Sequence, residues 1–201
     1  MSESIPASLE RLMEEFARLP GIGPRSAERL AFHILKSDKK TALSLAAAIR
    51  DVKEMVRHCR ICYNLTEKDP CLICTDPRRD TSQVFVVEQP KDLLLLEATG
   101  LIRGVYHVLL GHIAPLDGVE PDDLTIAALI ERVKQGGVRE VIISTNPTME
   151  GEGTALHIKS LLQDIEGVSV TRLARGLPSG SQIEYATRAV LQDAIEGRRE
   201  Y

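Results

Sequence analysis

Hydrophobic side chains recur at two different periods along this chain, and the change of period divides it. Up to about residue 57, apolar residues lie three or four positions apart, which predicts amphipathic helices. A short turn rich in glycine and proline at residues 19–24 would join the first two helices, and a third helix would occupy residues 41–56. This part of the chain is therefore predicted to be helical throughout.

Short apolar runs alternate with helical patterns in the second half of the chain. The candidate strands are residues 84–87, 105–110, 140–144 and 168–171. The candidate helices are residues 91–98, 121–135, 154–165 and 183–196. Strands that alternate with helices are joined by crossover connections, which favours a mainly parallel sheet covered on both faces. The pattern predicts a multidomain α/β protein whose N-terminal part is helical.

All the cysteines of the chain lie between these two parts, in a segment with little hydrophobic periodicity. They form two Cys-x2-Cys pairs separated by eight residues: Cys59, Cys62, Cys71 and Cys74. Two such pairs offer four thiolates to one tetrahedral Zn²⁺, and a closed shell of thiolates leaves no place for an activated water. We therefore predict one structural zinc ion, in a finger at residues 58–79 that needs the metal to fold.

Two disulfides, a redox-active pair and an iron–sulfur cluster are the other uses of such cysteines. The N-terminus has no basic stretch followed by an apolar core, and no apolar run approaches the about 20 residues that span a bilayer. We expect a cytoplasmic protein with no membrane partner, in which thiols stay reduced. An iron–sulfur cluster is then the main alternative to zinc, and His58 beside the cysteines is interpreted as a bystander.

The turn between the first two helices, Leu-Pro-Gly-Ile-Gly-Pro-Arg, has the features of a helix-hairpin-helix. Gly21 and Gly23 lack side chains, so their backbone N–H groups can approach a phosphate. Pro24 suits the first turn of the next helix, whose N-terminal dipole attracts anions. Arg25 and Arg29 lie four positions apart on one helical face and can neutralise phosphates. The predicted DNA binding is independent of sequence and sensitive to salt, and an ordinary turn between packed helices is the alternative.

The formal net charge of −4 is unevenly distributed along the chain. Residues 1–80 carry 14 Lys and Arg against 12 Asp and Glu, whereas residues 81–201 carry 11 against 17. DNA is therefore expected to meet the N-terminal half, and a metal ion or a basic protein the C-terminal half. Four acidic residues near the ends of predicted strands form what we call the acidic edge: Glu88, Asp92, Glu150 and Glu152.

These parts, in this order, resemble the RecR family of bacterial recombination proteins. The resemblance covers residues 19–32, 59–66, 71–76, 106–109 with Gly111, 115–119, 144–148 and 171–178. It implies four segments: a helix-hairpin-helix DNA-binding region (1–57), a four-cysteine zinc finger (58–79), a Toprim domain with a Rossmann-like parallel sheet (82–177) and a short helical C-terminal region for oligomerisation (178–201).

The resemblance also implies a role in the cell. RecR proteins act with RecO and RecF in RecBC-independent recombinational DNA repair, where they help to load RecA onto gapped or single-stranded DNA. They bind single-stranded, double-stranded or gapped DNA without sequence preference, with the basic DNA-contacting positions of the family at Arg25 and Arg29, and they assemble into homo-oligomeric rings. We therefore expect a DNA-binding recombination mediator that is a scaffold rather than an enzyme.

Catalytic Toprim proteins, such as topoisomerases and primases, provide the alternative. They resemble this chain at Glu88 but have an Asp-x-Asp pair after a later strand, where this chain has Asn146-Pro147-Thr148. A neutral amide binds Mg²⁺ less well than a carboxylate does, so a Mg²⁺-dependent nuclease or phosphotransferase is the less favoured function. We instead expect the acidic edge to dock RecO. A protein adaptor without any DNA contact is a third possibility.

Overall fold

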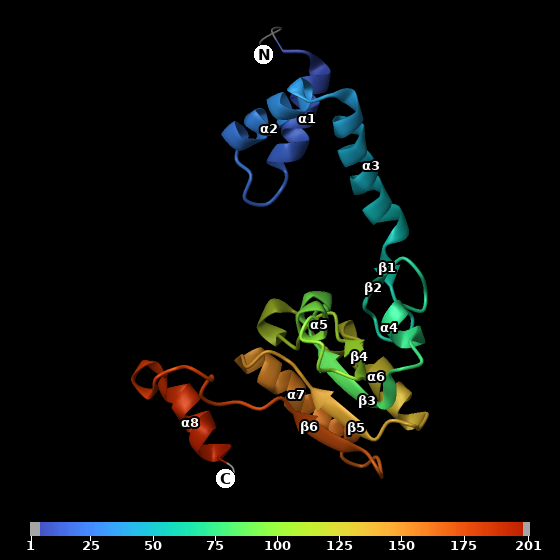
Figure 1. Ribbon diagram of the computed structural model, residues 1–201, viewed down its shortest axis with the longest axis vertical. Coiled ribbons are helices and arrows are strands. Elements are labelled where there is room, and N and C mark those ends of the chain that lie inside the picture. The colour runs from blue at the N-terminus through green and yellow to red at the C-terminus, as the bar shows by residue number, and fades with distance from the viewer. Residues whose placement is uncertain (1–4, 199–201) are drawn as a thin grey trace. The chain divides into compact units, whose positions relative to one another are not determined.

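The chain divides into two units after Val56, and the computed structural model describes residues 5–198 (Figure 1). The first unit contains three helices: α1 (Ala7–Ala17), α2 (Pro24–Lys36) and α3 (Lys39–Met55). Helices α1 and α2 pack against each other, and their buried residues are Leu9, Ala27 and Ala31. The expectation that this part of the chain is helical is confirmed. Residues 1–4 of the predicted DNA-binding region and 199–201 of the predicted C-terminal region lie outside the described residues.

Local capping decides where α3 begins. The Asp38 side chain accepts a hydrogen bond from the Thr41 backbone N–H (3.0 Å), so Asp38 is the N-cap. The helix therefore begins at Lys39, two residues before the start that hydrophobic periodicity predicts. None of the residues of α3 is buried.

The second unit is built on a parallel sheet. Its four strands lie in the order β4-β3-β5-β6 and have the bounds β3 (Asp80–Val87), β4 (Gly104–Val108), β5 (Glu140–Ile143) and β6 (Ser169–Arg172). All three neighbouring pairs are parallel, which confirms the predicted crossover topology. The cysteines lie ahead of this sheet, in a segment with the short antiparallel strands β1 (Arg57–His58) and β2 (Leu65–Thr66) and the helix α4 (Leu72–Thr75).

Helices follow the strands as expected, with differences at their ends. Those of the second unit are α5 (Pro90–Glu97), α6 (Ile126–Lys134), α7 (Met149–Leu162) and α8 (Arg188–Glu196), and the short 3-10 helices are η1 (Pro115–Asp117), η2 (Pro121–Asp123) and η3 (Ile183–Tyr185). The helices predicted at 121–135 and 183–196 are each divided into a 3-10 turn and an α-helix. Helix α7 begins five residues before the predicted start, because the Thr148 hydroxyl accepts the Gly151 N–H (3.1 Å) as an N-cap.

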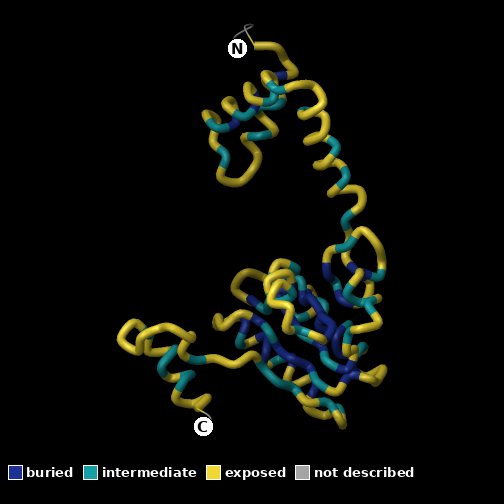
Figure 2. Tube along the Cα trace, viewed as in Figure 1, coloured by how far each residue is buried: buried dark blue, intermediate teal, exposed yellow. Residues whose placement is uncertain are grey.

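Alternate residues of β3 face two hydrophobic clusters, one on each side of the sheet. Val84 and Val86 belong to the cluster that α6 and α7 cover. Val87 belongs to the other, which α5 covers and against which Tyr63 and Ile73 of the cysteine segment pack. Figure 2 shows that buried residues gather along the strands of the sheet. The sheet is thus covered on both faces, and the cysteine segment supplies part of one cover.

The length and hydropathy of the described helices decide whether any of them could cross a membrane. Within residues 5–198, no helix combines the length and the apolar character that crossing a bilayer requires.

Candidate metal centre and DNA-contacting hairpin

The cysteine side chains converge as the sequence predicts. The Sγ atoms of Cys59, Cys62, Cys71 and Cys74 all lie within 4.8 Å of one another. The Sγ–Sγ distance is 4.0 Å for Cys59–Cys74 and 3.5 Å for Cys62–Cys71. A tetrahedral Zn²⁺ with Zn–S bonds of about 2.3 Å separates its sulfur ligands by about 3.8 Å. The donor set and its spacing therefore fit one zinc ion. In the described part of the chain, no second group of three or more His, Cys, Asp or Glu side chains is placed to hold a metal.

The surroundings of the sulfur atoms disfavour the free thiolate at Cys62 and Cys71, whereas at Cys59 burial is outweighed by backbone N–H donors, which lower its pKa to about 7. A hydrogen bond with Cys74 and burial raise the pKa of the Cys62 thiol. Burial likewise raises the pKa of Cys71, to about 11. A divalent cation offsets both burial and mutual repulsion, because it holds the thiolates by direct coordination. The Cys71 backbone N–H, which donates to the Cys59 Sγ (3.3 Å), adds a further stabilising dipole.

The cysteine segment is tied to the sheet directly after Cys62. The Cys62 carbonyl accepts a hydrogen bond from the Val108 N–H of β4 (2.8 Å). Tyr63 adopts φ 61°, a left-handed conformation that is uncommon outside glycine. Its ring centroid lies 5.3 Å from that of His107, a buried residue of β4. The fold of the cysteine segment and the position of β4 thus depend on each other.

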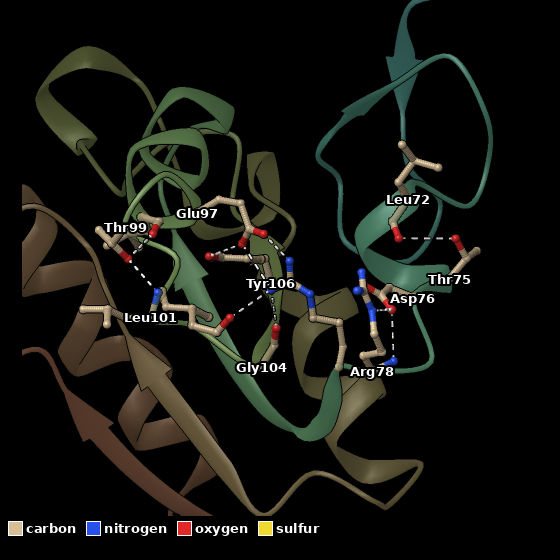
Figure 3. Close-up of polar contacts among 12 residues, drawn as sticks. Leu72, Thr75, Asp76, Arg78, Glu97, Thr99, Leu101, Gly104 and Tyr106 are labelled. Atoms are coloured by element: carbon tan, nitrogen blue, oxygen red, sulfur yellow. Dashed lines mark hydrogen bonds and ion pairs between the residues drawn. The ribbon is translucent and has the colours of Figure 1, made fainter.

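A second link follows the last cysteine. Arg79 forms an ion pair with Glu97 of α5 and donates hydrogen bonds to the carbonyls of Ile102 (3.2 Å) and Gly104 (3.3 Å). The Tyr106 hydroxyl donates to the same Glu97 carboxylate (2.8 Å), as Figure 3 shows. Sequence reasoning missed this network, because a pair separated by 18 positions leaves no local pattern.

The predicted DNA-contacting residues lie at the start of α2. Gly21 has φ 78°, which favours glycine, and Gly23 is the N-cap before Pro24 at the first helical position. A Cβ atom built on either glycine would have no neighbour within 4 Å, so the turn is open on its outer side. Arg25 and Arg29 are both exposed. The structure therefore brings a helix N-terminus, an open turn and two cations to one end of the hairpin.

The acidic edge is less open than its sequence indicates. Glu88 is only 3% exposed. One carboxylate oxygen accepts the Asn146 backbone N–H (2.7 Å), and the other accepts the Asn146 side-chain amide (2.7 Å) and contacts His112 Nδ1 (3.1 Å). Glu88 and Asn146 thus meet at the carboxyl edge of the sheet. Both oxygens of Glu88, however, are occupied by groups of the chain itself.

The other three residues of the acidic edge differ in their surroundings. Asp92 accepts the Gln89 N–H (2.9 Å) in the capping box of α5. Glu152 forms ion pairs with Arg172 and Arg175. Glu150 is exposed, and no hydrogen bond or ion pair of its carboxylate is recorded within residues 5–198. Glu150 is thus the residue of this edge best placed to meet another molecule.

Three family models match the chain in the order of these elements. They are the RecR helix-hairpin-helix (residues 9–53), the RecR four-cysteine zinc finger domain (56–76) and the Toprim domain (82–174). The protein is 55% identical to the Recombination protein RecR of Rhodopirellula baltica over 188 residues, which are 94% of each chain. It is 55% identical to that of Rubrobacter xylanophilus over 193 residues (96% of each chain) and 54% identical to that of Chloroflexus aurantiacus over 198 residues (98% of this chain and 96% of the relative). With a four-cysteine cluster inside the matched zinc-finger region and identity over nearly its whole length, the chain belongs to the RecR family of recombination proteins.

Proposed function

We propose that this recombination protein binds DNA at the hairpin between α1 and α2 and holds it for partner proteins, as a scaffold without catalysis. The observation that carries the proposal is the group at the start of α2: an open glycine turn, a helix N-terminus, and the exposed side chains of Arg25 and Arg29. Each of these features attracts phosphate and none reads a base. Binding without sequence preference to single-stranded, double-stranded or gapped DNA follows from that chemistry.

Replacing both Arg25 and Arg29 with alanine is expected to weaken DNA binding about tenfold or more at moderate salt, because two phosphate contacts are lost per chain. The slope of log affinity against log salt concentration should fall by about two. Fluorescence anisotropy with labelled single-stranded, double-stranded and gapped oligonucleotides measures both quantities.

The matched control is Arg50→Ala, since Arg50 is an exposed arginine of the same unit whose charge is already paired with Asp51 (2.9 Å). This control should bind DNA like the unaltered protein. Equal affinities and equal slopes for the double variant and the control would contradict DNA binding at the hairpin and favour an adaptor that never contacts DNA.

We propose one Zn²⁺ per chain, held by the four cysteines in a structural role. The support is the fit of the sulfur spacing and the closed set of four sulfur ligands, which leaves no position for a substrate or water. The metal when bound supplies the cross-link that a short segment with few apolar residues needs in order to fold.

Catalysis by a Mg²⁺-dependent Toprim nuclease is not part of the proposal. Glu88, the carboxylate that such an enzyme would need at this edge, accepts three contacts from Asn146 and His112. A carboxylate so engaged would have to exchange these partners for a cation.

We place the protein in the cytoplasm, where its ligand, chromosomal DNA, is present.

We propose that RecO docks at the acidic edge with Glu150 as a contacting residue, whereas Glu88 and Asp92 support the edge from within. Glu150 borders a groove of about 600 Å³ whose lining includes the exposed apolar side chains of Leu116 and Met149 and the acidic side chains of Asp117 and Glu120. A groove that combines exposed apolar side chains with acidic ones fits a basic segment that carries an apolar side chain.

Charge reversal by Glu150→Lys is expected to lower the affinity for RecO about tenfold while DNA binding by the chain alone stays unchanged. Surface plasmon resonance with purified RecO measures the first effect, and anisotropy measures the second. Glu166→Lys is the control, because Glu166 is exposed in the same unit but does not line the groove. The docking proposal is wrong if the two variants bind RecO equally well.

We further propose that the protein forms a homo-oligomeric ring and acts with RecO and RecF to load RecA at gapped or single-stranded DNA in RecBC-independent repair. Support for self-association comes from α3, which exposes an apolar face. The exposed residues of this face are Leu45, Ile49 and Val52. The molecular mass in solution tests the oligomer.

A further inference from the structure

The outer edge of β4 is closed by two groups that come from different parts of the chain. The Leu109 N–H donates to the Val87 carbonyl of β3 (2.8 Å). Backbone groups of successive residues in a strand point to opposite sides, so those of Tyr106 and Val108 point away from β3. The outward Val108 N–H donates to the Cys62 carbonyl (2.8 Å). The outward Tyr106 carbonyl accepts from Arg132 Nη1 of α6 (2.8 Å). Arg132 and the cysteine segment thus contact the same edge of β4. Their contact points, Tyr106 and Val108, lie two residues apart, which is about 7 Å along the strand.

Charge is the second part of the argument. A Zn²⁺ ion with four thiolates carries a net charge of −2. Cys59 and Cys62 are fully buried and Cys71 is 3% exposed, so water screens this charge poorly. The guanidinium of the partly buried Arg132 is permanently positive and has five N–H donors. Within residues 5–198 its one recorded hydrogen bond goes to a neutral carbonyl, and no carboxylate pairs with it.

The basic groups on the same strand and beside the first cysteine are less well placed for this role. His107 is the buried basic residue on the same strand, but burial lowers its pKa to about 4, so it is neutral at pH 7. Arg57 and Arg60 flank the first cysteine but are exposed, where water screens their charge. Burial lowers the pKa of Arg132, whereas attraction by all four cysteines raises it. Burial is the larger of the two effects, and the attraction by the cysteines agrees with the position of Arg132 on the strand edge beside them.

We propose that Arg132 is a positioning residue of the metal centre, whose guanidinium balances the negative charge of the zinc–thiolate cluster while its hydrogen bond to Tyr106 holds α6 at the edge of β4. The inference rests on the proposed zinc site. If Arg132 has this role, the stability of the metal centre depends on α6, a helix that begins more than fifty residues after the last cysteine.

The test compares the zinc affinity of full-length variants by competition with a chromophoric chelator. Arg132→Gln removes the charge but keeps an amide that can donate to Tyr106, and Arg132→Met removes both. Arg132→Lys keeps the charge. Lys134→Gln is the control, because Lys134 is an exposed cation of the same helix that lies beside Glu131 (3.5 Å). Far-UV circular dichroism of the zinc-loaded variants verifies that each is folded.

We expect Arg132→Gln and Arg132→Met to bind zinc about tenfold or more weakly, the size of effect that outer partners of metal ligands produce. Arg132→Lys and the control should stay within about threefold of the unaltered protein. If Arg132→Met does not fold, Arg132→Gln decides alone. A glutamine variant with unaltered affinity, or a lysine variant as weak as the glutamine variant, would overturn the proposal. Failure of the zinc site itself would show separately, as unaltered protein purified without one zinc per chain.

Discussion

Replacing Cys62 with serine is expected to lower the zinc affinity about 100-fold or more, which corresponds to about 3 kcal/mol. Cys62 is fully buried and supplies one of the four clustered sulfur atoms. A serine hydroxyl has nearly the same shape but is a poor zinc ligand. Zinc content after dialysis and chelator competition measure the effect.

The consequences should extend into the sheet. The backbone carbonyl of Cys62 closes the edge of β4 at Val108, and the next residue, Tyr63, packs on His107. Loss of the metal should therefore expose amides of β4 to hydrogen exchange as well as those of the cysteine segment. Lys68→Ala is the control, because Lys68 is exposed in the same segment and is not one of the clustered residues. An unaltered zinc content in the serine variant would contradict a four-cysteine site.

Replacing Gly151 with alanine is expected to destabilise the protein by about 3 kcal/mol, at the upper end of the usual cost of overpacking. A Cβ atom at this position would lie 2.1 Å from the Asn146 carbonyl oxygen and 2.8 Å from Glu88 Oε1. Backbone atoms cannot move away without breaking the contacts between Asn146 and Glu88. Urea unfolding followed by circular dichroism measures the change.

Gly153 provides a matched control in the same helix, because a Cβ atom there would have no neighbour within 4 Å. Gly153→Ala should stabilise the protein by about 0.5–1 kcal/mol, since alanine is the better helix former. The opposite signs test whether Glu88 and Asn146 form a tightly packed structural unit. If Gly151→Ala were as stable as the control variant, that interpretation of the acidic edge would be wrong.

The features that were predicted correctly from the sequence depend on residues that lie close together in the chain. The paired cysteines are close in sequence, so their spacing alone indicates that they converge on one metal ion. The glycines and Pro24 of the hairpin act on their own backbone, so the turn and the start of α2 are also local. Strand and helix periods were sufficient for the parallel sheet, although capping by Asp38 and Thr148 moved helix ends.

By itself, then, the sequence determined the family, the parallel sheet, the four-cysteine cluster and the hairpin, because each depends on residue types at fixed short spacings. Only the tertiary structure decided that Glu88 is buried against Asn146, that Glu152 is paired with two arginines, and that Arg132 reaches the strand edge beside the cysteines. Burial and pairing of charged residues depend on crossovers that bring together positions far apart in the chain. A pattern of polar residues shows where charges are, but the packing of the strands and helices decides which of them remain available to a partner.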